Sequence, residues 1–369
     1  MKNACVILKN EKGADESAIA SLFDAFRAQG YIFDEVRTLL NADTEKLRTV
    51  LTEGKKEYEN LLLLADKSQL SAVKSAVSLS GVFKEDSFQG TIDGAGVFSD
   101  KTKSLFLLSF DGTETGTGYF QSVLLPYLQR KYGKKTDRTV IRSIGANEAH
   151  IRSLLAKAKL IDGGQMQYFH TRRYDEDIIE ILYDENISKR LESDVLRVFA
   201  EGLGDTVYAL DDTPLGEQLV RLLKLRGKKI SVAESFTGGG VGRRIVSVSG
   251  ASEVYFEGLN TYDELSKMKR LGVTEYTLRS YGAVSDQTAY EMAAGLIATG
   301  NCDISVATTG LAGPKTDRSM LPVGLCYIAV GTRERVFVYR YKFDGTREDI
   351  TEKAINYALF LAYKQLKTM

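Results

Sequence analysis

One segment of the chain joins a serine to a glycine-rich turn. Residues 233–240 read Ala-Glu-Ser-Phe-Thr-Gly-Gly-Gly and follow an apolar strand. A strand that enters such a turn exposes the Ser235 hydroxyl and bares backbone N–H groups beside the positive end of the next helix. These donors stabilise either an oxyanion or a phosphate. A third interpretation is a tight turn whose glycines only permit positive φ, and this segment alone does not decide among the three.

A second segment supplies a candidate base. Residues 261–267 read Thr-Tyr-Asp-Glu-Leu-Ser-Lys, where a strand enters a helix. The chain's two histidines, His150 and His170, have no partners at metal-ligand spacing, so serine chemistry here needs a lysine. Lysine deprotonates a serine only when burial or a nearby cation lowers its pKa from about 10.4 toward neutrality. The alternatives are a solvated helix lysine at 267 and a packing tyrosine with a wet hydroxyl at 262.

A third segment, Ala-Thr-Thr-Gly-Leu-Ala-Gly-Pro at 307–314, again ends a strand in small residues. It predicts a second anion cradle, with candidate contacts at Thr308, Thr309, Gly310 and Gly313. Farther on, Arg347 opens the last helix, where its guanidinium is placed either to bind phosphate or carboxylate or to form a surface salt bridge. All these loops follow strands, and ligands of open α/β sheets bind beyond strand ends.

The elements that carry these loops begin with a helix near residue 212. Pro214 suits its first turn, Gly227 ends it, and the residues between them make an apolar stripe of Leu215, Leu219, Leu222 and Leu223. Strands are predicted at 229–235, 253–262, 304–310, 324–330 and 335–343. Helices are predicted after the glycines, from Asp263, around 287–300 and from Arg347. Residues 213–369 are therefore expected to form a helix-covered α/β sandwich.

The first part of the chain predicts two further domains. Residues 1–135 alternate apolar runs such as Asn-Leu-Leu-Leu-Leu-Ala with helical stretches, which indicates βαβ units on a parallel sheet. Residues 136–212 alternate strands and helices on a smaller scale and suggest a small α+β linking domain. The whole chain is thus a multi-domain α/β protein, and its 369 residues exceed what one core usually organises.

The composition argues against nucleic acid and membranes as partners. Lys plus Arg and Asp plus Glu both number 49, so no global field favours nucleic acid or an anionic membrane. Any anionic ligand must be held locally. Cys5, Cys302 and Cys326 fit neither a disulfide framework nor a metal motif, and no apolar run approaches a membrane span. We expect a cytoplasmic protein.

In order and spacing, the last domain resembles the C-terminal domain of the competence/damage-inducible CinA family, whose stand-alone members are nicotinamide mononucleotide deamidases. The resemblance runs from about 213 to 369 and rests on AESFTGG, GASEVYFEGLNTYDELSK, LGV, YGAVSDQTAYEMAAG, ATTGLAGP, LPVG and FDGTR. It implies Ser235 as nucleophile and Lys267 as base, 32 residues apart, with Tyr262 also catalytic. It further implies a small nucleotide substrate, bound by Thr237, Gly238, Gly239, Thr309, Gly310, Gly313 and Arg347. We expect the protein to need no cofactor and no metal, and we expect it to form a homo-oligomer.

The sequence departs from the family pattern in both halves. Phe236 stands where the family usually has cysteine, and Lys-Thr-Asp-Arg-Ser-Met at 315–320 replaces a glycine-rich stretch, which affects substrate preference. The N-terminal half resembles the CinA molybdopterin-binding-like domain in degenerate form. Its three motif segments read KNEKGADES, LLLADKSQLSA and FDGTETG. Asp66 is the only carboxylate in the ADKSQL part of the second segment, and Glu114 in the third lies about one position from the family's glutamate. A hard metal therefore lacks an obvious oxygen cage, and we expect a pseudo-enzyme or oligomerisation scaffold.

Three functions remain open. The first is an amidohydrolase that converts nicotinamide mononucleotide to nicotinic acid mononucleotide and ammonia in pyridine nucleotide salvage. In it, loop N–H groups from Thr237 to Gly239 would hold the oxyanion. The second is a non-catalytic nucleotide sensor in which the same loops bind phosphate. The third is a retained N-terminal ADP-ribose pyrophosphatase.

Overall fold

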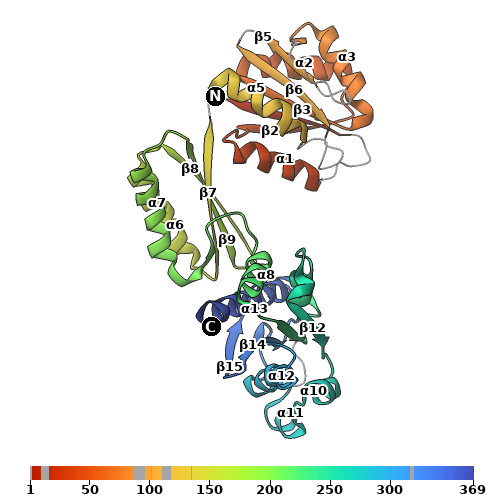
Figure 1. Ribbon diagram of the computed structural model, residues 1–369. Helices are drawn as coiled ribbons and strands as arrows, with labels where there is room; N and C mark the ends of the chain where they lie inside the picture. The colour runs from red at the N-terminus through yellow and green to blue at the C-terminus, as the bar shows by residue number, and fades with distance from the viewer. Residues whose placement is uncertain are drawn as a thin grey trace. The chain divides into compact units, whose positions relative to one another are not determined.

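The computed structural model describes residues 2–9, 16–85, 96–100, 102–109, 118–133, 135–315 and 320–369 (Figure 1). Its contacts divide the chain into two compact units. The first comprises Met1–Arg138, Gln165–Gln167 and Leu182–Ser188, and the second comprises the rest. Among the described residues, no helix has both the length and the apolar character needed to cross a membrane. The three-domain division at 135 and 212 stays a prediction.

The first unit is built on a six-stranded sheet. Its strand order is β2-β1-β3-β6-β5-β4. The strands are β1 (Asn3–Lys9), β2 (Glu35–Leu40), β3 (Asn60–Ala65), β4 (Lys84–Glu85), β5 (Gly96–Asp100) and β6 (Lys103–Ser109). The first four in this order pair in parallel, as expected from βαβ units, whereas β5 and β4 add an antiparallel edge that the sequence analysis did not anticipate.

Both faces of this sheet are covered, which explains why β3 is buried along its whole length. One core cluster joins the sheet to α1 (Glu16–Ala28), to the turn at Phe120–Leu124 and to α5 (Leu125–Tyr132). The other joins it to α2 (Thr44–Glu57) and α3 (Leu70–Ser80). Helix α1 turns one apolar face to the sheet, on which Ile19, Leu22 and Phe26 are buried and Phe23 is partly buried.

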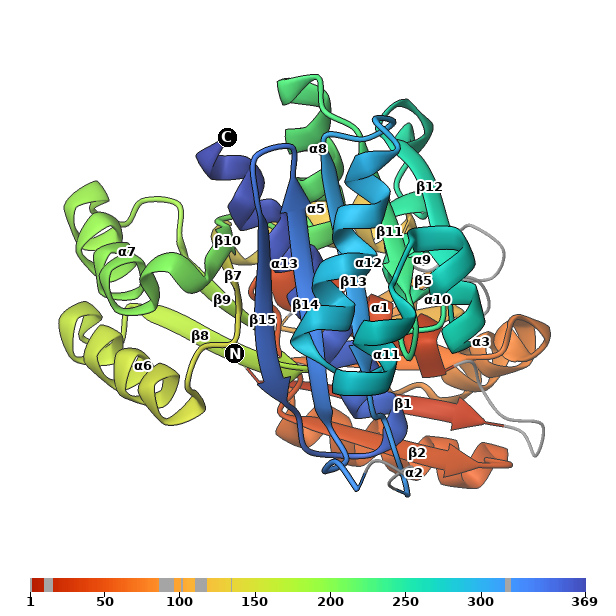
Figure 2. The same ribbon diagram turned by 90° about the horizontal axis from the view of Figure 1, so that it is seen from below.

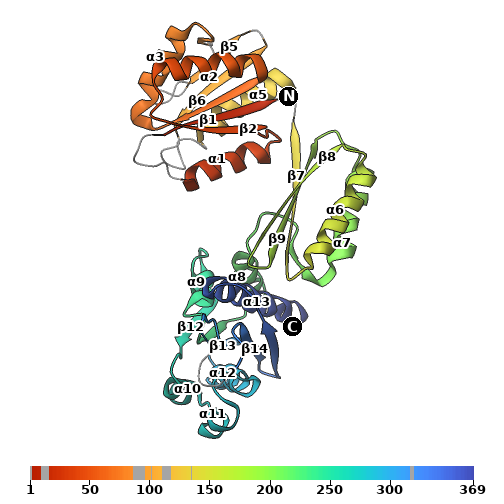
Figure 3. The same cartoon turned by 180° about the vertical axis from the view of Figure 1, so that it is seen from behind.

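A four-stranded sheet of order β10-β7-β9-β8 follows. Its strands are β7 (Thr136–Ile144), β8 (Met166–Arg173), β9 (Glu176–Asp184) and β10 (Val207–Ala209). Helices α6 (Glu148–Asp162) and α7 (Lys189–Leu203) lie side by side on one face of the sheet (Figure 3). The β8–β9 turn contains two residues with positive φ, Tyr174 and Asp175. This arrangement agrees with the predicted small α+β alternation.

The last sheet has the order β12-β11-β13-β14-β15. Its strands are β11 (Ile230–Glu234), β12 (Tyr255–Asn260), β13 (Ile304–Gly310), β14 (Leu325–Thr332) and β15 (Val336–Lys342). Strand β11 pairs in parallel with β12 and β13, while β14 and β15 extend the sheet antiparallel. The carboxyl ends of β12, β11 and β13 therefore meet at one edge, which is where the candidate loops begin.

Helices cover both faces of this sheet (Figure 2). One face carries α8 (Leu215–Arg226), α9 (Gly240–Val246) and α13 (Arg347–Thr368). The other carries α10 (Glu264–Leu271), α11 (Glu275–Tyr281) and α12 (Asp286–Ala298). The expected α/β sandwich is confirmed. Helix α11, which has only 7 residues, was not expected from the sequence.

Helix α12 packs closely on α10, the helix that carries Lys267. Gly295 permits this approach, because a methyl group at that position would overlap the carbonyl oxygen of Leu271. We expect Gly295→Ala to lower the free energy of unfolding by about 1–3 kcal/mol, since backbone must move to make room. Gly54→Ala in α2 is the matched control, because its new methyl would lie 3.0 Å from the flexible end of Leu61. Equal losses for both variants in denaturant unfolding would contradict the packing argument.

Candidate active site

Ser235 lies at the carboxyl end of the central strand β11. It is 9% exposed, and its N–H donates to the carbonyl oxygen of Thr308 on the adjacent strand β13 at 3.1 Å. All five residues of β11 are buried, so the strand forms a rigid base for the serine. The backbone of Ser235 is thus fixed by the sheet, while its hydroxyl lies at the edge where three parallel strands end.

Lys267 is buried beside this serine. Its side chain is 1% exposed. The Nζ atom donates to Ser235 Oγ at 3.0 Å and to the carbonyl oxygens of Thr261 and Tyr262 at 2.6 and 3.1 Å. These contacts use all three ammonium protons. The alternative of a solvated helix lysine is therefore wrong.

Helix α10 places the lysine there. Asp263 is its N-cap, with a side chain that accepts from the N–H of Leu265 at 2.8 Å, and Lys267 lies one turn later. A side chain one turn into a helix leans back toward the N-terminus, which here is the end of β12. Burial lowers the pKa of Lys267 from 10.5 to about 8, although the nearby carboxylates of Glu264 and Asp263 oppose the shift.

The glycine-rich loop has few free donors. The N–H of Gly238 donates to the carbonyl oxygen of Ser235 at 3.1 Å, and the N–H of Gly239 donates to Glu234 Oε2 at 3.0 Å. Among the described residues, no partner is seen for the N–H groups of Phe236 and Thr237. The prediction that N–H groups from Thr237 to Gly239 hold an oxyanion is therefore wrong for Gly238 and Gly239, whose N–H groups are already bound within the protein, and it stays a prediction for Thr237.

Glu234 is the polar residue that the sequence analysis missed. Its side chain is 2% exposed, and the carboxylate accepts from three backbone N–H groups. The donors are Gly239 at 3.0 Å, Val241 at 3.1 Å and Gly242 at 2.8 Å. The signal in the sequence was an acidic residue at the end of a strand that otherwise holds only small and apolar residues. The positive end of α9 is thus occupied by the protein's own carboxylate.

Phe236 and Thr237 are both buried. Phe236, the departure from the family's cysteine, packs in a cluster with Ala312, Cys326, Phe343, Ile350 and Ala354. The hydroxyls of Thr237 and Thr308 lie 2.7 Å apart, which links this loop to the end of β13. The added bulk at 236 is accommodated in the core.

The second predicted cradle is held mainly by internal contacts. The Thr309 hydroxyl donates to the carbonyl oxygen of Ala283 at 2.6 Å. A methyl group at Gly310 would crowd Cys326, so this glycine permits close packing. Arg347 donates to the carbonyl oxygen of Gly313 at 2.8 Å, and thereby joins the start of α13 to this loop. Substrate contacts by these residues stay predictions.

Tyr262 differs from the other two predicted catalytic residues. Its side chain is 66% exposed, and the group that contacts Lys267 is its backbone carbonyl. The structure therefore brings Ser235 and Lys267 together but shows no hydrogen bond from the Tyr262 hydroxyl to either among the described residues. A catalytic role of the tyrosine side chain stays a prediction.

Several predictions fall outside the described residues. Residues 10–15 and 110–117, which hold most of two degenerate N-terminal motifs and Glu114, are among them, as are residues 316–319 of the altered loop. Asp66 of the third motif is described. Its Oδ1 accepts from the backbone N–H and the hydroxyl of Ser68 at 2.8 and 2.5 Å, so the carboxylate closes a local turn.

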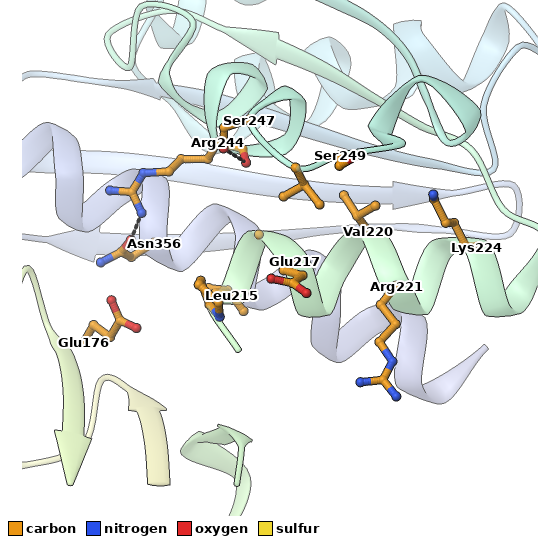
Figure 4. Close-up of a pocket in the computed structure, with 13 residues that line it drawn as sticks. Glu176, Leu215, Glu217, Val220, Arg221, Lys224, Arg244, Ser247, Ser249 and Asn356 are labelled. Carbon is orange, nitrogen blue, oxygen red and sulfur yellow. Dashed lines mark hydrogen bonds between the residues drawn. The ribbon is translucent and has the colours of Figure 1, made fainter. Parts of the chain in front are cut away.

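A cavity of about 540 Å³ lies elsewhere in the second unit (Figure 4). It runs along α8, and neither Ser235 nor Lys267 lines it. Two of its cations are paired, Lys224 with Glu253 at 2.8 Å and Arg244 with Glu352 at 2.5 Å. The serine–lysine pair is therefore the stronger candidate site.

Comparison with known proteins finds one matching family model and relatives with similar names. The family model for the CinA C-terminal domain matches residues 212–366. A CinA-like protein from Kosmotoga olearia is 31% identical over 297 residues, which cover 78% of this chain and 70% of that protein. A putative competence-damage inducible protein from Caldicellulosiruptor saccharolyticus is 34% identical over 249 residues.

The coverage of these relatives is partial. The match to the Caldicellulosiruptor protein covers 67% of this chain and 61% of the relative's length. Among solved structures, the competence damage-inducible protein A (ComA) from Klebsiella pneumoniae is 31% identical, with a TM-score of 0.41. That match covers 42% of this chain and 95% of the Klebsiella chain.

Proposed function

The chain belongs to the CinA family, and from this premise we propose that its last domain is an amidohydrolase. The proposed reaction converts nicotinamide mononucleotide and water to nicotinic acid mononucleotide and ammonia. The observation that carries the proposal is the buried hydrogen bond of 3.0 Å between Lys267 Nζ and Ser235 Oγ. A serine bonded to a lysine of lowered pKa is the arrangement that activates a hydroxyl without histidine.

The partners of Lys267 suit the neutral amine. A neutral amine has two protons, which the carbonyl oxygens of Thr261 and Tyr262 accept. Its lone pair is then directed at the Ser235 hydroxyl. In this state Lys267 takes the serine proton as Oγ attacks the carboxamide carbon. The N–H groups of Phe236 and Thr237 are the proposed donors to the resulting oxyanion.

The rest of the cycle uses the same two residues. Lys267 returns its proton to the leaving nitrogen, the C–N bond breaks, and ammonia departs from an acyl-serine. Water then attacks the acyl carbon while Lys267 accepts a proton from it. The bond between the acyl carbon and Ser235 Oγ breaks, Lys267 returns the proton to Oγ, and the acid product departs. A metal ion or cofactor is not required for any of these steps.

The Glu234 carboxylate at the N-terminus of α9 argues against the competing function of a nucleotide sensor. A nucleotide sensor would use the glycine loop as a phosphate cradle, but the N–H groups of Gly239, Val241 and Gly242 are bound to Glu234. Phosphate would have to displace a buried carboxylate of like charge. This arrangement favours the oxyanion use of the loop over the phosphate use.

A panel assay on the full chain tests the proposal. Nicotinamide mononucleotide, nicotinamide riboside, nicotinamide and glutamine are each incubated with the protein, and ammonia and the acid product are measured by a coupled enzyme and by mass spectrometry. We expect ammonia and nicotinic acid mononucleotide in equal amounts from the mononucleotide. Nucleotide binding without turnover of any amide would support the sensor instead.

A separate incubation of the full chain tests the N-terminal half. ADP-ribose with Mg²⁺, Mn²⁺ or Co²⁺ is expected to give no AMP, because pyrophosphate cleavage needs metal-held water and charge neutralisation. Metal-dependent AMP formation would contradict this expectation and would support the retained pyrophosphatase.

A further inference from the structure

Glu234 is a buried carboxylate without a cation. Its side chain is 2% exposed, and among the described residues it takes part in no ion pair. Three backbone N–H groups, at 2.8 to 3.1 Å, are its partners instead. A buried carboxylate is stable only when hydrogen bonds replace its lost hydration, and these three do so. The residue immediately precedes the proposed nucleophile.

These bonds fix the loop that carries the proposed oxyanion donors. The loop leaves the sheet at Ser235, whose N–H is bound to β13, and it is tied down again at Gly239 by the Glu234 carboxylate. The N–H groups of Phe236 and Thr237 lie between the two anchors. Gly239 has a φ of +94°, a conformation in which glycine is favoured, so the second anchor maintains an unusual backbone turn.

We propose that Glu234 is a positioning residue, which holds the 235–239 loop in one conformation and so fixes the direction of the Phe236 and Thr237 N–H groups, for which no acceptor is seen in the described part of the chain. The inference rests on the proposed amidohydrolase function. Glu234 does not touch the reacting atoms. It acts through the loop, and its effect belongs to the step in which charge develops on the substrate oxygen.

Only a glutamate satisfies this arrangement. Both carboxylate oxygens accept, Oε1 from Gly242 and Oε2 from Gly239 and Val241. A glutamine has one acceptor oxygen and would turn its NH₂ group toward an N–H donor. An aspartate keeps both oxygens but is shorter by one methylene group. The space beside the carboxylate is also filled, because a methyl group at Gly242 would lie 2.5 Å from the Tyr255 hydroxyl and in van der Waals contact with Glu234 Oε1.

The principal test compares Glu234→Gln with a matched carboxylate elsewhere in the same sandwich. Glu291 also binds a helix start, accepting from the Thr274 N–H at 2.7 Å and the Thr277 hydroxyl at 2.6 Å. We expect Glu234→Gln to lower kcat for ammonia release by about 10- to 100-fold with KM within about threefold of wild type. Glu291→Gln is expected to lower Tm and to leave kcat within about twofold.

A second readout does not need the natural substrate. Diisopropyl fluorophosphate labels an activated serine and leaves an oxygen in the oxyanion position, and mass spectrometry reports the rate at Ser235. We expect labelling to slow about 10-fold or more in Glu234→Gln and to stay unchanged in Glu291→Gln. If Glu234→Gln does not fold cooperatively, Glu234→Asp replaces it, with an intermediate loss expected.

The outcomes separate this inference from the proposed function. Wild-type ammonia release with an unchanged kcat and labelling rate in the Glu234 variant overturns the positioning role alone. A loss carried entirely by KM, or by the folded fraction, also overturns it. If wild type labels at Ser235 but hydrolyses no amide, the proposed function fails, and the labelling rates of the two variants still decide the role of Glu234.

Discussion

Ser235→Ala is expected to lower kcat for ammonia release by a factor on the order of 10³ or more, because the variant lacks the atom that attacks the carboxamide. The fold should persist. The hydroxyl has Lys267 as its partner, and that ammonium keeps the carbonyl oxygens of Thr261 and Tyr262 as acceptors. Steady-state kinetics with thermal unfolding of the same sample measure both effects.

Alanine is not a suitable replacement for Lys267, although it is for Ser235. It is 1% exposed, so Lys267→Ala would leave a cavity, whereas Lys267→Met keeps most of the buried volume. We expect Lys267→Met to lose activity as severely as Ser235→Ala, and the double variant to be little worse than either, because the two residues act as a unit. Ser247→Ala, on the separate cavity along α8, is the control. Near wild-type turnover in Lys267→Met would exclude the serine–lysine mechanism.

The activity is expected to rise with pH through about 8, the pKa to which burial lowers Lys267. Only the neutral amine accepts the serine proton, so kcat/KM should rise about tenfold per pH unit below this value and level off above it. A profile of kcat/KM from pH 5.5 to 10 measures the midpoint. A flat profile, or one that falls through this range, would contradict the role of Lys267 as base.

The free energy of unfolding should also change as Lys267 titrates. The folded-state pKa of about 8 lies below the value of about 10.4 for an unfolded lysine. Between these two values the unfolded chain binds more protons, so the contribution of Lys267 to the free energy of unfolding becomes more favourable as pH rises through that window. Below about pH 8 the cost of burying the ammonium applies in full. Denaturant unfolding at pH 7 and 9.5 should show this increase in wild type, and Lys267→Met should lack it.

The serine and the lysine could be predicted from residue types and spacing, but the environment of the lysine could not. The burial of Lys267 depends on tertiary packing, because its Nζ lies against Ser235, 32 residues earlier in the chain, and its helix α10 packs against α12 at Gly295. No local pattern distinguishes such a lysine from a solvated one. The candidate base is thus visible from sequence, while the lowered pKa that makes Lys267 a base is a tertiary property.

The loop after β11 shows the opposite limit. The glycines correctly predicted a turn after β11, with positive φ at Gly238 and Gly239, but the sequence could not show which acceptors bind the N–H groups of this turn. The Glu234 side chain folds back over α9 and occupies the N–H of Gly239, which had been expected to bind the oxyanion. Hydrogen-bond partners within a loop depend on its three-dimensional path, so donor counts from sequence are upper limits.

Strands were predicted more accurately than sheet pairing. The run at 304–310 matches β13, and the last helix begins at Arg347 as expected. The antiparallel pairing of β5 with β6 in the first unit was missed, because a run of apolar residues predicts a strand but does not show its direction in the sheet. Helix α11 was missed because its 7 residues are fewer than the roughly 11 to 18 over which helical periodicity can be recognised.

The burial of Phe236 has an evolutionary consequence. Ser235 lies at the sheet edge, whereas its neighbour packs with Ala312, Cys326, Phe343 and Ile350. The size of the residue at 236 is therefore constrained by core volume and not by the reaction at 235. Across related proteins, residues at 236 and at these four positions should covary in volume, while the serine stays invariant. A comparison of aligned sequences that found such paired changes would identify this cluster as one packing unit.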